Sequence, residues 1–121
     1  MTKTIDLETV DSFLKICREE IRKKRCKFLG YRNLEVNGKK ISTKQALLDI
    51  GIMNKKDIWK HVCSLVKEDC KDISHDRDFS RDMNSEVFEF IKVINKKKVY
   101  IKLTLNDRGV LCISFHESNK R

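Results

Sequence analysis

Residues 87–116 read VFEFIKVINKKKVYIKLTLNDRGVLCISFH, and this stretch decides the fold. It holds three runs rich in β-branched and aromatic residues, separated by the turn sequences NKKK and NDRG. The pattern predicts an antiparallel meander with strands over residues 87–94, 98–105 and 110–116.

The turn between the last two strands predicts how they pair. Residues 107–109 suit a three-residue hairpin loop in which Gly109 takes the left-handed conformation. The pairs that follow are Asn106 with Val110, Leu103 with Ile113, Ile101 with Phe115 and Tyr100 with His116. The alternation of apolar and polar residues agrees with this register, because each apolar residue in the strands then faces another.

Alternation also separates a core face from a polar face. The expected core set is Val99, Ile101, Leu103, Leu105, Leu111, Ile113 and Phe115. The expected polar set is Tyr100, Lys102, Thr104, Cys112, Ser114 and His116. In the preceding strand, an even-length loop over residues 95–98 places Phe88 and Phe90 in the core and Glu89 beside Lys102.

A solvent-facing strip is therefore expected to carry Glu89, Tyr100, Lys102, Ser114 and His116. The polar side of any half-buried sheet needs such residues, so the strip alone does not require a site. It nevertheless contains what metal-free RNA cleavage needs. A Tyr, Glu or His can assist removal of the 2′-hydroxyl proton, lysines can offset charge on the phosphate, and a His can protonate the leaving 5′-oxygen.

The residues before the meander predict helices. Residues 6–25 form one helix with an apolar stripe and a basic opposite face. A short helix is capped by Ser42 or Thr43 and runs through Ile50, with Gly51 where a helix ends, and a third helix spans residues 55–67. Helices first and strands last indicate a single α+β domain over residues 1–121, with the N-terminal helices packed on the C-terminal sheet.

Two segments have weaker patterns. A short strand is expected around residues 28–31, and residues 68–85 are polar and patternless, which predicts a long loop. Within that loop Arg77 and Arg81 can contact a phosphate backbone, or pair locally with the neighbouring aspartates. Lys71 is either an ordinary loop lysine or a phosphate contact.

The charge balance favours an anionic partner. The chain has 27 Lys+Arg against 18 Asp+Glu, a net charge of +9, which attracts polyanions. The same excess also suits a solvated surface or the docking face for an acidic protein. No apolar run approaches the length of a membrane span and no charged-then-apolar leader opens the sequence, so we expect a cytoplasmic protein without membrane contact.

The cysteines and histidines do not predict a metal site. The 5 cysteines include no C-x-x-C pair, and a free cysteine on an apolar face behaves as a small hydrophobe. His61 and His75 have no ligand partner at metal spacing. We therefore expect no metal and no cofactor.

The segment VYIKLTL, followed by a turn and VLCISFHE, resembles the C-terminal hairpin of the MqsR family of mRNA interferase toxins. Upstream, ALLDIGI, a further helix and SLVKEDCK are similar to that family's middle segment. The likeness covers roughly residues 10–118 and is concentrated in 60–72 and 86–117.

The resemblance implies a RelE-like α+β fold and ribosome-independent cutting of mRNA at short sequences. It also implies a cognate antitoxin, encoded nearby, that binds and silences the enzyme. In this group the 2′-hydroxyl is thought to attack the adjacent phosphate without a metal, leaving a 2′,3′-cyclic phosphate and a 5′-hydroxyl end.

Four positions take catalytic roles by this resemblance. The family tyrosine of the V-Y-x-K run falls on Tyr100, and a lysine after an x-D-[aromatic] step falls on Lys71, although Cys70 stands where the aromatic is usual. Glu89 lies near a family glutamine, and His116 occupies a lysine position. A Glu can act as a base where a Gln cannot, and a His exchanges protons at neutral pH more readily than a Lys. The segment Val36–Thr43 is an insertion relative to the family.

Two other classes of function fit the same residues. One is a non-catalytic nucleic-acid-binding module that uses the basic sheet, although few aromatics lie on the predicted polar face for stacking bases. The other is a protein-interaction domain whose basic first helix docks an acidic partner.

Overall fold

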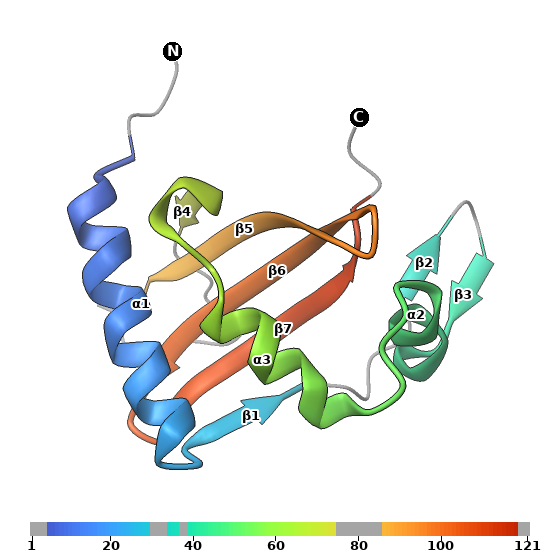
Figure 1. Cartoon of the computed structure of the whole chain (residues 1–121), viewed down its shortest axis with the longest axis horizontal. Helices are drawn as coiled ribbons and strands as arrows, with labels where there is room; N and C mark the ends of the chain where they lie inside the picture. Colours follow the sequence, from blue (N-terminus) through green and yellow to red (C-terminus); the bar gives the residue numbers. More distant parts are fainter. Residues whose placement is uncertain (1–4, 30–33, 37–38, 75–85, 119–121) are drawn as a thin grey trace.

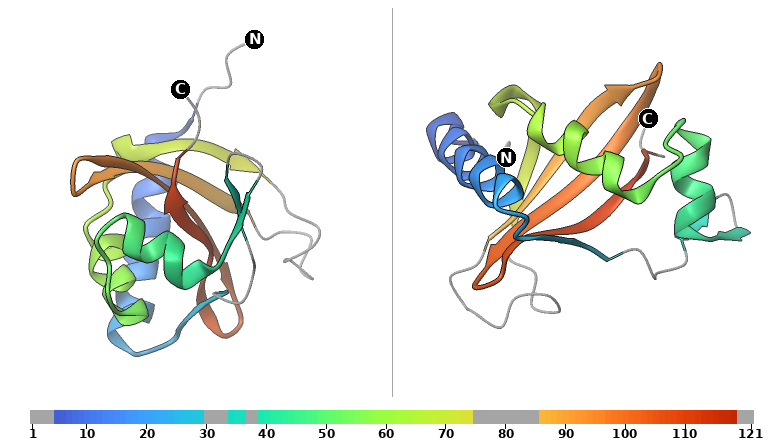
Figure 2. Two further views of the ribbon diagram at one scale, coloured as in Figure 1. Left: turned by 90° about the vertical axis from the view of Figure 1, so that its right-hand side faces the viewer. Right: turned by 60° about the horizontal axis from the view of Figure 1, so that its bottom comes forward.

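The computed structural model describes residues 5–29, 34–36, 39–74 and 86–118. Its elements in chain order are α1 (Leu7–Arg22), β1 (Cys26–Phe28), β2 (Leu34–Val36), β3 (Lys39–Ile41), α2 (Thr43–Asp49), the 3₁₀ helix η1 (Lys55–Asp57), α3 (Ile58–Cys63), the 3₁₀ helix η2 (Lys67–Asp69), β4 (Cys70–Ser74), β5 (Val87–Ile94), β6 (Lys97–Asn106) and β7 (Gly109–Glu117). The main sheet has the strand order β1-β7-β6-β5-β4, with α1 and α3 lying across one face (Figures 1 and 2). The predicted α+β class is confirmed.

Helix α1 is closed at both ends by local hydrogen bonds. The Asp6 carboxylate accepts from the backbone N–H of Glu8 at 3.0 Å, which satisfies one of the free donors of the first turn. At the other end Lys24 has a φ of +63°, and the N–H of Arg25 donates to the Glu20 carbonyl at 2.8 Å. This is a Schellman ending, and it stops the helix three residues before the predicted residue 25.

The next helices follow the capping signals only in part. Ser42 caps α2 by accepting from the Gln45 N–H at 3.1 Å, and Gly51 follows with a φ of +81°, as predicted. The helix expected over residues 55–67 is wrong in extent. Its residues instead form η1, then α3, which ends at Cys63, and the first residue of η2, while Val66 is 52% exposed.

The β5–β6 hairpin confirms the predicted even-length loop. Asn95 and Lys96 both have positive φ, and Ile94 pairs with Lys97 across them. A two-residue turn with this geometry matches the natural twist of the strands. Its register buries both phenylalanines of β5 and sets Glu89 directly opposite Lys102.

The β6–β7 hairpin confirms the predicted register at its far end and corrects it near the turn. Tyr100 pairs with His116 and Ile101 with Phe115, as expected. Nearer the turn the pairs are Leu103 with Cys112, Thr104 with Leu111, Leu105 with Val110 and Asn106 with Gly109. Between the two halves Ile113 has no partner, so β7 contains a β-bulge.

The bulge exchanges the faces of the residues on its turn side. Cys112, predicted on the polar face, is fully buried in the main core opposite Leu103. Leu111 and Ile113, predicted in that core, instead form a second apolar cluster with Leu29 and Val87. The predicted alternation holds only for a regular β7. The one extra residue at the bulge reverses which face each residue on the turn side occupies.

Two further strands complete the sheet. β1 runs parallel to β7 and lies slightly before the strand expected at residues 28–31, whose last two positions fall outside the described residues. β4 pairs antiparallel with β5, with a register shift between Cys70 and Asp72. The loop predicted from residue 68 is therefore wrong as far as Ser74, and the sheet is mixed rather than antiparallel throughout.

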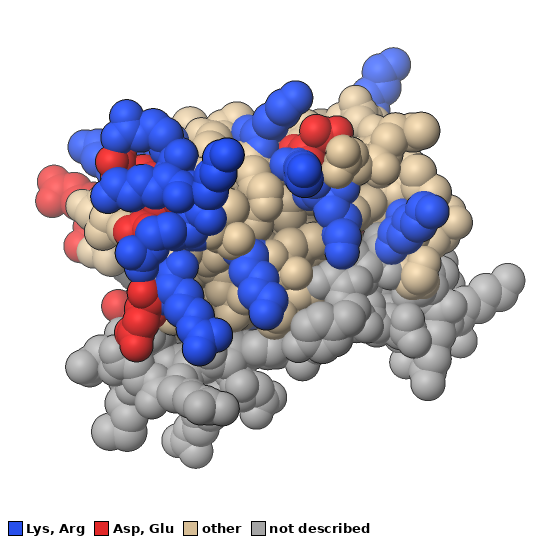
Figure 3. Space-filling view, turned by 90° about the horizontal axis from the view of Figure 1, so that it is seen from below, with Lys and Arg blue, Asp and Glu red and all other residues tan. Residues whose placement is uncertain are grey.

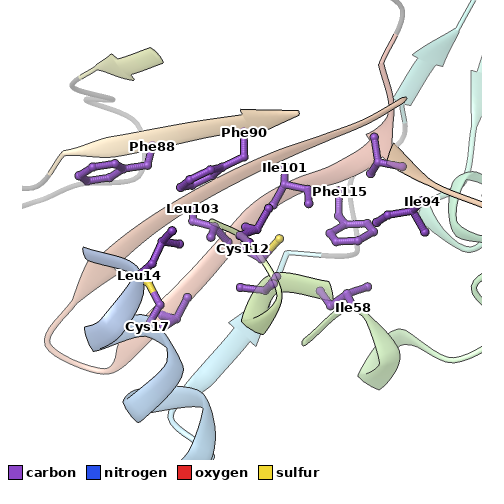
Figure 4. Close-up of a cluster of buried hydrophobic side chains, with 14 of the residues drawn as sticks. Leu14, Cys17, Ile58, Phe88, Phe90, Ile94, Ile101, Leu103, Cys112 and Phe115 are labelled. Carbon is purple, nitrogen blue, oxygen red and sulfur yellow. The ribbon is translucent and has the colours of Figure 1, made fainter. Parts of the chain in front are cut away.

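The core lies between the sheet and the helices (Figure 4). Buried side chains of α1, α2 and α3 all join this one cluster, and Phe13 of α1 stacks on Phe88 with ring centroids 3.8 Å apart. Trp59 is partly buried and packs against the cluster. Among the described residues, no helix combines the length and the apolar character needed to cross a membrane.

Candidate active site

The face of the sheet opposite α1 and α3, called the second face below, brings the predicted strip together. It is composed of Glu89 on β5, Tyr100 and Lys102 on β6, and Ser114 and His116 on β7, all partly buried. Glu89, Lys102 and Ser114 form one cross-strand row, and Tyr100 and His116 form the next. These residues are called the polar strip from here on. Because the register places them side by side, five residues distant in sequence share one surface.

Tyr100 and Glu89 are joined by a hydrogen bond. The tyrosine hydroxyl donates to Oε1 of Glu89, reaching from one cross-strand row into the next. A hydroxyl that donates to a carboxylate keeps its own oxygen lone pairs available for another proton. The pair can therefore take a proton at the hydroxyl oxygen and pass one on to the carboxylate.

His116 lies against Tyr100, and a backbone carbonyl favours one tautomer of its neutral ring. The two ring centroids are 5.4 Å apart with the planes inclined at 33°. Nδ1 of His116 is 2.9 Å from the carbonyl oxygen of Glu117, and a carbonyl oxygen can only accept. The neutral ring therefore holds its proton on Nδ1, which leaves Nε2 to exchange protons with a substrate.

Strand β4 adds a carboxylate that the sequence did not predict. Asp72 pairs with Glu89, so the cross-strand row runs Asp72, Glu89, Lys102, Ser114. Lys71 is the extra residue at the β4 bulge, exposed at the sheet edge and adjacent in sequence to Asp72. The segment around Asp72 is polar and has no strand pattern, so only its pairing with β5 reveals this carboxylate.

The polar strip covers only part of the second face. Towards the β6–β7 turn this face carries the second apolar cluster, and Thr104, predicted to be exposed, is 1% exposed. The Thr104 hydroxyl is satisfied by donating to the Glu86 carbonyl at 2.8 Å. The apolar end therefore bounds the strip on one side. Arg77 and Arg81, predicted to contact phosphate, lie outside the described residues.

Basic side chains also gather away from the strip. Seen from below, Lys and Arg concentrate over the end of α1 and the adjoining β1 (Figure 3). Part of that charge is balanced locally, since Arg22 pairs with Glu19 and Arg25 with Glu20. Arg25 also donates to the Asp107 carbonyl at 2.6 Å, so it ties α1 to the β6–β7 turn.

Burial raises the pKa of all five thiols. Cys17, Cys70 and Cys112 are buried, and burial raises the pKa of each, that of Cys70 to about 11. Cys26 and Cys63 are partly exposed, with pKa values also raised by burial. Within the described ranges, no three His, Cys, Asp or Glu side chains come together as a metal centre would require.

Comparison of the chain with protein-family models, with curated proteins and with solved structures gave no match.

Proposed function

We propose that this chain is an endoribonuclease that cuts mRNA by attack of a 2′-hydroxyl on the adjacent phosphate. The observation that carries this proposal is the contact chain Glu89–Tyr100–His116, with Lys102 beside it. It places a proton acceptor, a proton donor and a cation on one surface, which is the minimum that such a reaction needs. Glu89 and His116 are also two of the positions at which the sequence departs from the MqsR pattern, and both contact the same tyrosine.

The proposed reaction is one in-line displacement. The 2′-hydroxyl oxygen bonds to phosphorus while its proton passes to the Tyr100 hydroxyl and the tyrosine proton passes to Glu89. The bond from phosphorus to the 5′-oxygen breaks, and protonated His116 gives its Nε2 proton to that oxygen. Lys102 and Lys71 offset the charge on the phosphate oxygens, and Ser114 donates a hydrogen bond to them. The products are a 2′,3′-cyclic phosphate and a 5′-hydroxyl end.

The same proposal includes a RelE-like arrangement, membership of the MqsR-like toxins and a cytoplasmic site of action. The helices packed on one face of the sheet and the resemblance of residues 99–117 to the family hairpin support it. A toxin of this kind requires a cognate antitoxin, so we expect a short adjoining gene whose product forms a complex with this chain and stops the cutting.

Incubation of purified protein with a defined RNA in EDTA tests the proposal. We expect discrete cuts whose 3′ ends resist ligation until the cyclic phosphate is opened and the resulting phosphate is removed. The matched control is the His116→Ala variant, which keeps the fold and lacks the proton donor. Binding without cutting would favour a non-catalytic nucleic-acid module, and neither binding nor cutting would favour a protein-interaction domain.

A further inference from the structure

The second face continues past Tyr100 towards the β5–β6 turn, where it changes in character. Lys98 shares this face with Tyr100 and Lys102, because alternate residues of a strand point the same way. Directly opposite Lys98 is Val93, which is 62% exposed, and opposite Tyr100 is the partly exposed Ile91. A cation and an apolar surface therefore adjoin the polar strip.

Lys98 differs from its neighbour Lys97 in what its ammonium group contacts. Nζ of Lys97 lies 3.6 Å from Oε2 of Glu117 and donates to the Asp49 carbonyl at 2.7 Å, so Lys97 holds elements together. Lys98 is exposed, and within the described part of the chain its ammonium has no ion pair and no hydrogen bond.

The spacing along β6 suits a strand of nucleic acid. Lys98, Tyr100 and Lys102 follow one another on this face at roughly 6.8 Å along the strand. Consecutive phosphates of an extended RNA chain are separated by a comparable distance. If the phosphate that is cut lies among Tyr100, Lys102 and His116, the next phosphate comes within reach of Lys98.

We propose that Lys98 and Val93 form a second nucleotide subsite beside the cutting site. Lys98 binds the phosphate next to the one that is cut, and Val93 with Ile91 contacts the base of that nucleotide. This inference rests on the proposed function, since it assigns the direction in which RNA continues from the strip. It also accounts for a large exposed aliphatic residue beside an unpaired cation.

Binding of a mixed-sequence oligoribonucleotide with 2′-methoxy groups throughout tests the subsite without any cutting. The dissociation constant is measured over a range of salt concentrations for wild type, Lys98→Gln and Lys96→Gln. Each phosphate contact in single-stranded nucleic acid contributes about 0.7 to the slope of log K against log salt. We expect Lys98→Gln to reduce the slope by about this amount. Lys96→Gln removes the same charge from the adjacent turn and should leave the slope unchanged.

A second measurement locates the contact on the RNA. Single methylphosphonates, which carry no charge, replace each phosphate of the oligonucleotide in turn. At one position the neutral linkage should weaken binding to wild type and to Lys96→Gln but not to Lys98→Gln. Val93→Ser should weaken binding severalfold, and this loss should vanish when the adjoining base is removed.

Equal slopes for Lys98→Gln and Lys96→Gln, or methylphosphonate losses that are the same in every variant, would overturn the subsite. Failure of the nuclease proposal is distinguishable, because it is read from the cutting assay alone. If wild type cuts no RNA, the salt slopes and the methylphosphonate series still decide whether Lys98 binds a phosphate.

Discussion

At the scale of single residues, Tyr100 is the centre of the candidate site. Its hydroxyl donates to Glu89 on one neighbouring strand, and its ring lies beside His116 on the other. The carboxylate of Glu89 can accept a proton, and the imidazole of His116 can give or take one. The proton-transfer role proposed for Tyr100 therefore depends on both of these side chains.

The link between Tyr100 and Glu89 is tested by a double-mutant cycle. Tyr100→Phe and Glu89→Gln should each lower the cutting rate about a hundredfold, since each interrupts the same proton path. The double variant should be no slower than the worse single variant, because residues that act as one unit are not additive. Single-turnover rates with saturating protein measure this. Multiplicative losses would mean that the two residues act separately.

Lys24 provides a stability prediction at the same scale. It adopts a φ of +63° at the end of α1, a conformation that costs a residue with a side chain about 1 kcal/mol. Lys24→Gly should therefore raise the free energy of unfolding by about 0.5–1 kcal/mol, seen as a higher urea midpoint. The matched control is Lys23→Gly, because Lys23 has a φ of −81° and should gain nothing. A lower midpoint for Lys24→Gly would contradict this account.

At the scale of elements, sequence periodicity predicts the regular strand pairing, but it predicts neither the β-bulge in β7 nor strand β4. The β5–β6 turn and the Tyr100–His116 pair followed from the alternation and from even loop length, both of which are local properties. The bulge at Ile113 has no local signature, so the faces of the residues on its turn side were assigned wrongly. β4 is polar and pairs only because β5 lies beside it, which is a tertiary effect.

The residues of the polar strip lie in the regularly paired part of the sheet, which alternation predicts. The five predicted strip residues all lie beyond the bulge from the turn, or on strands without one, so their shared face was predicted correctly. Asp72 and the edge position of Lys71 depended on β4 and could not be predicted. Cys112 and Thr104 were expected to be exposed and are buried, which narrows the face available to a ligand.

Two of the described glycines, Gly51 and Gly109, have positive φ and allow a comparison between elements. A Cβ on Gly109 would lie 2.0 Å from the backbone oxygen of Arg25, whereas on Gly51 it would meet the side-chain nitrogen of Asn95 at 2.6 Å. A side chain can move aside and a paired backbone cannot. Gly109→Ala should therefore cost at least about 2 kcal/mol of unfolding free energy, and clearly more than Gly51→Ala. Urea unfolding of both variants measures this difference. Equal costs would show that Gly109 does not approach the Arg25 backbone this closely.

At the scale of the whole molecule, one core joins the three α-helices to the sheet. Its members extend from Val10 in α1 to Phe115 in β7, so the first and last elements are buried together. Such a core is expected to unfold as a unit. The buried thiols at three places in the chain report on whether it does.

Alkylation by iodoacetamide at neutral pH should divide the cysteines into two groups. Cys17, Cys70 and Cys112 should resist modification in the native protein, because burial excludes the reagent and raises their pKa values, so little thiolate forms. Cys26 and Cys63, which are partly exposed, should react first. Mass spectrometry after brief labelling in increasing urea should show the three buried thiols becoming reactive together. Early labelling of Cys112 alone would show that β7 opens separately.

The parallel pairing of β1 with β7 has a consequence for how the protein is made. Cys26 lies opposite Val110 and Phe28 opposite Cys112. β1 is translated early and can pair only after β7 has been made. Contacts so distant in sequence form late, because a long loop must close before they contribute. Tyr100 and His116 likewise meet only when β7 has left the ribosome. For a protein proposed to destroy messages, the nascent chain has no cutting site until β7 has emerged and paired with β6.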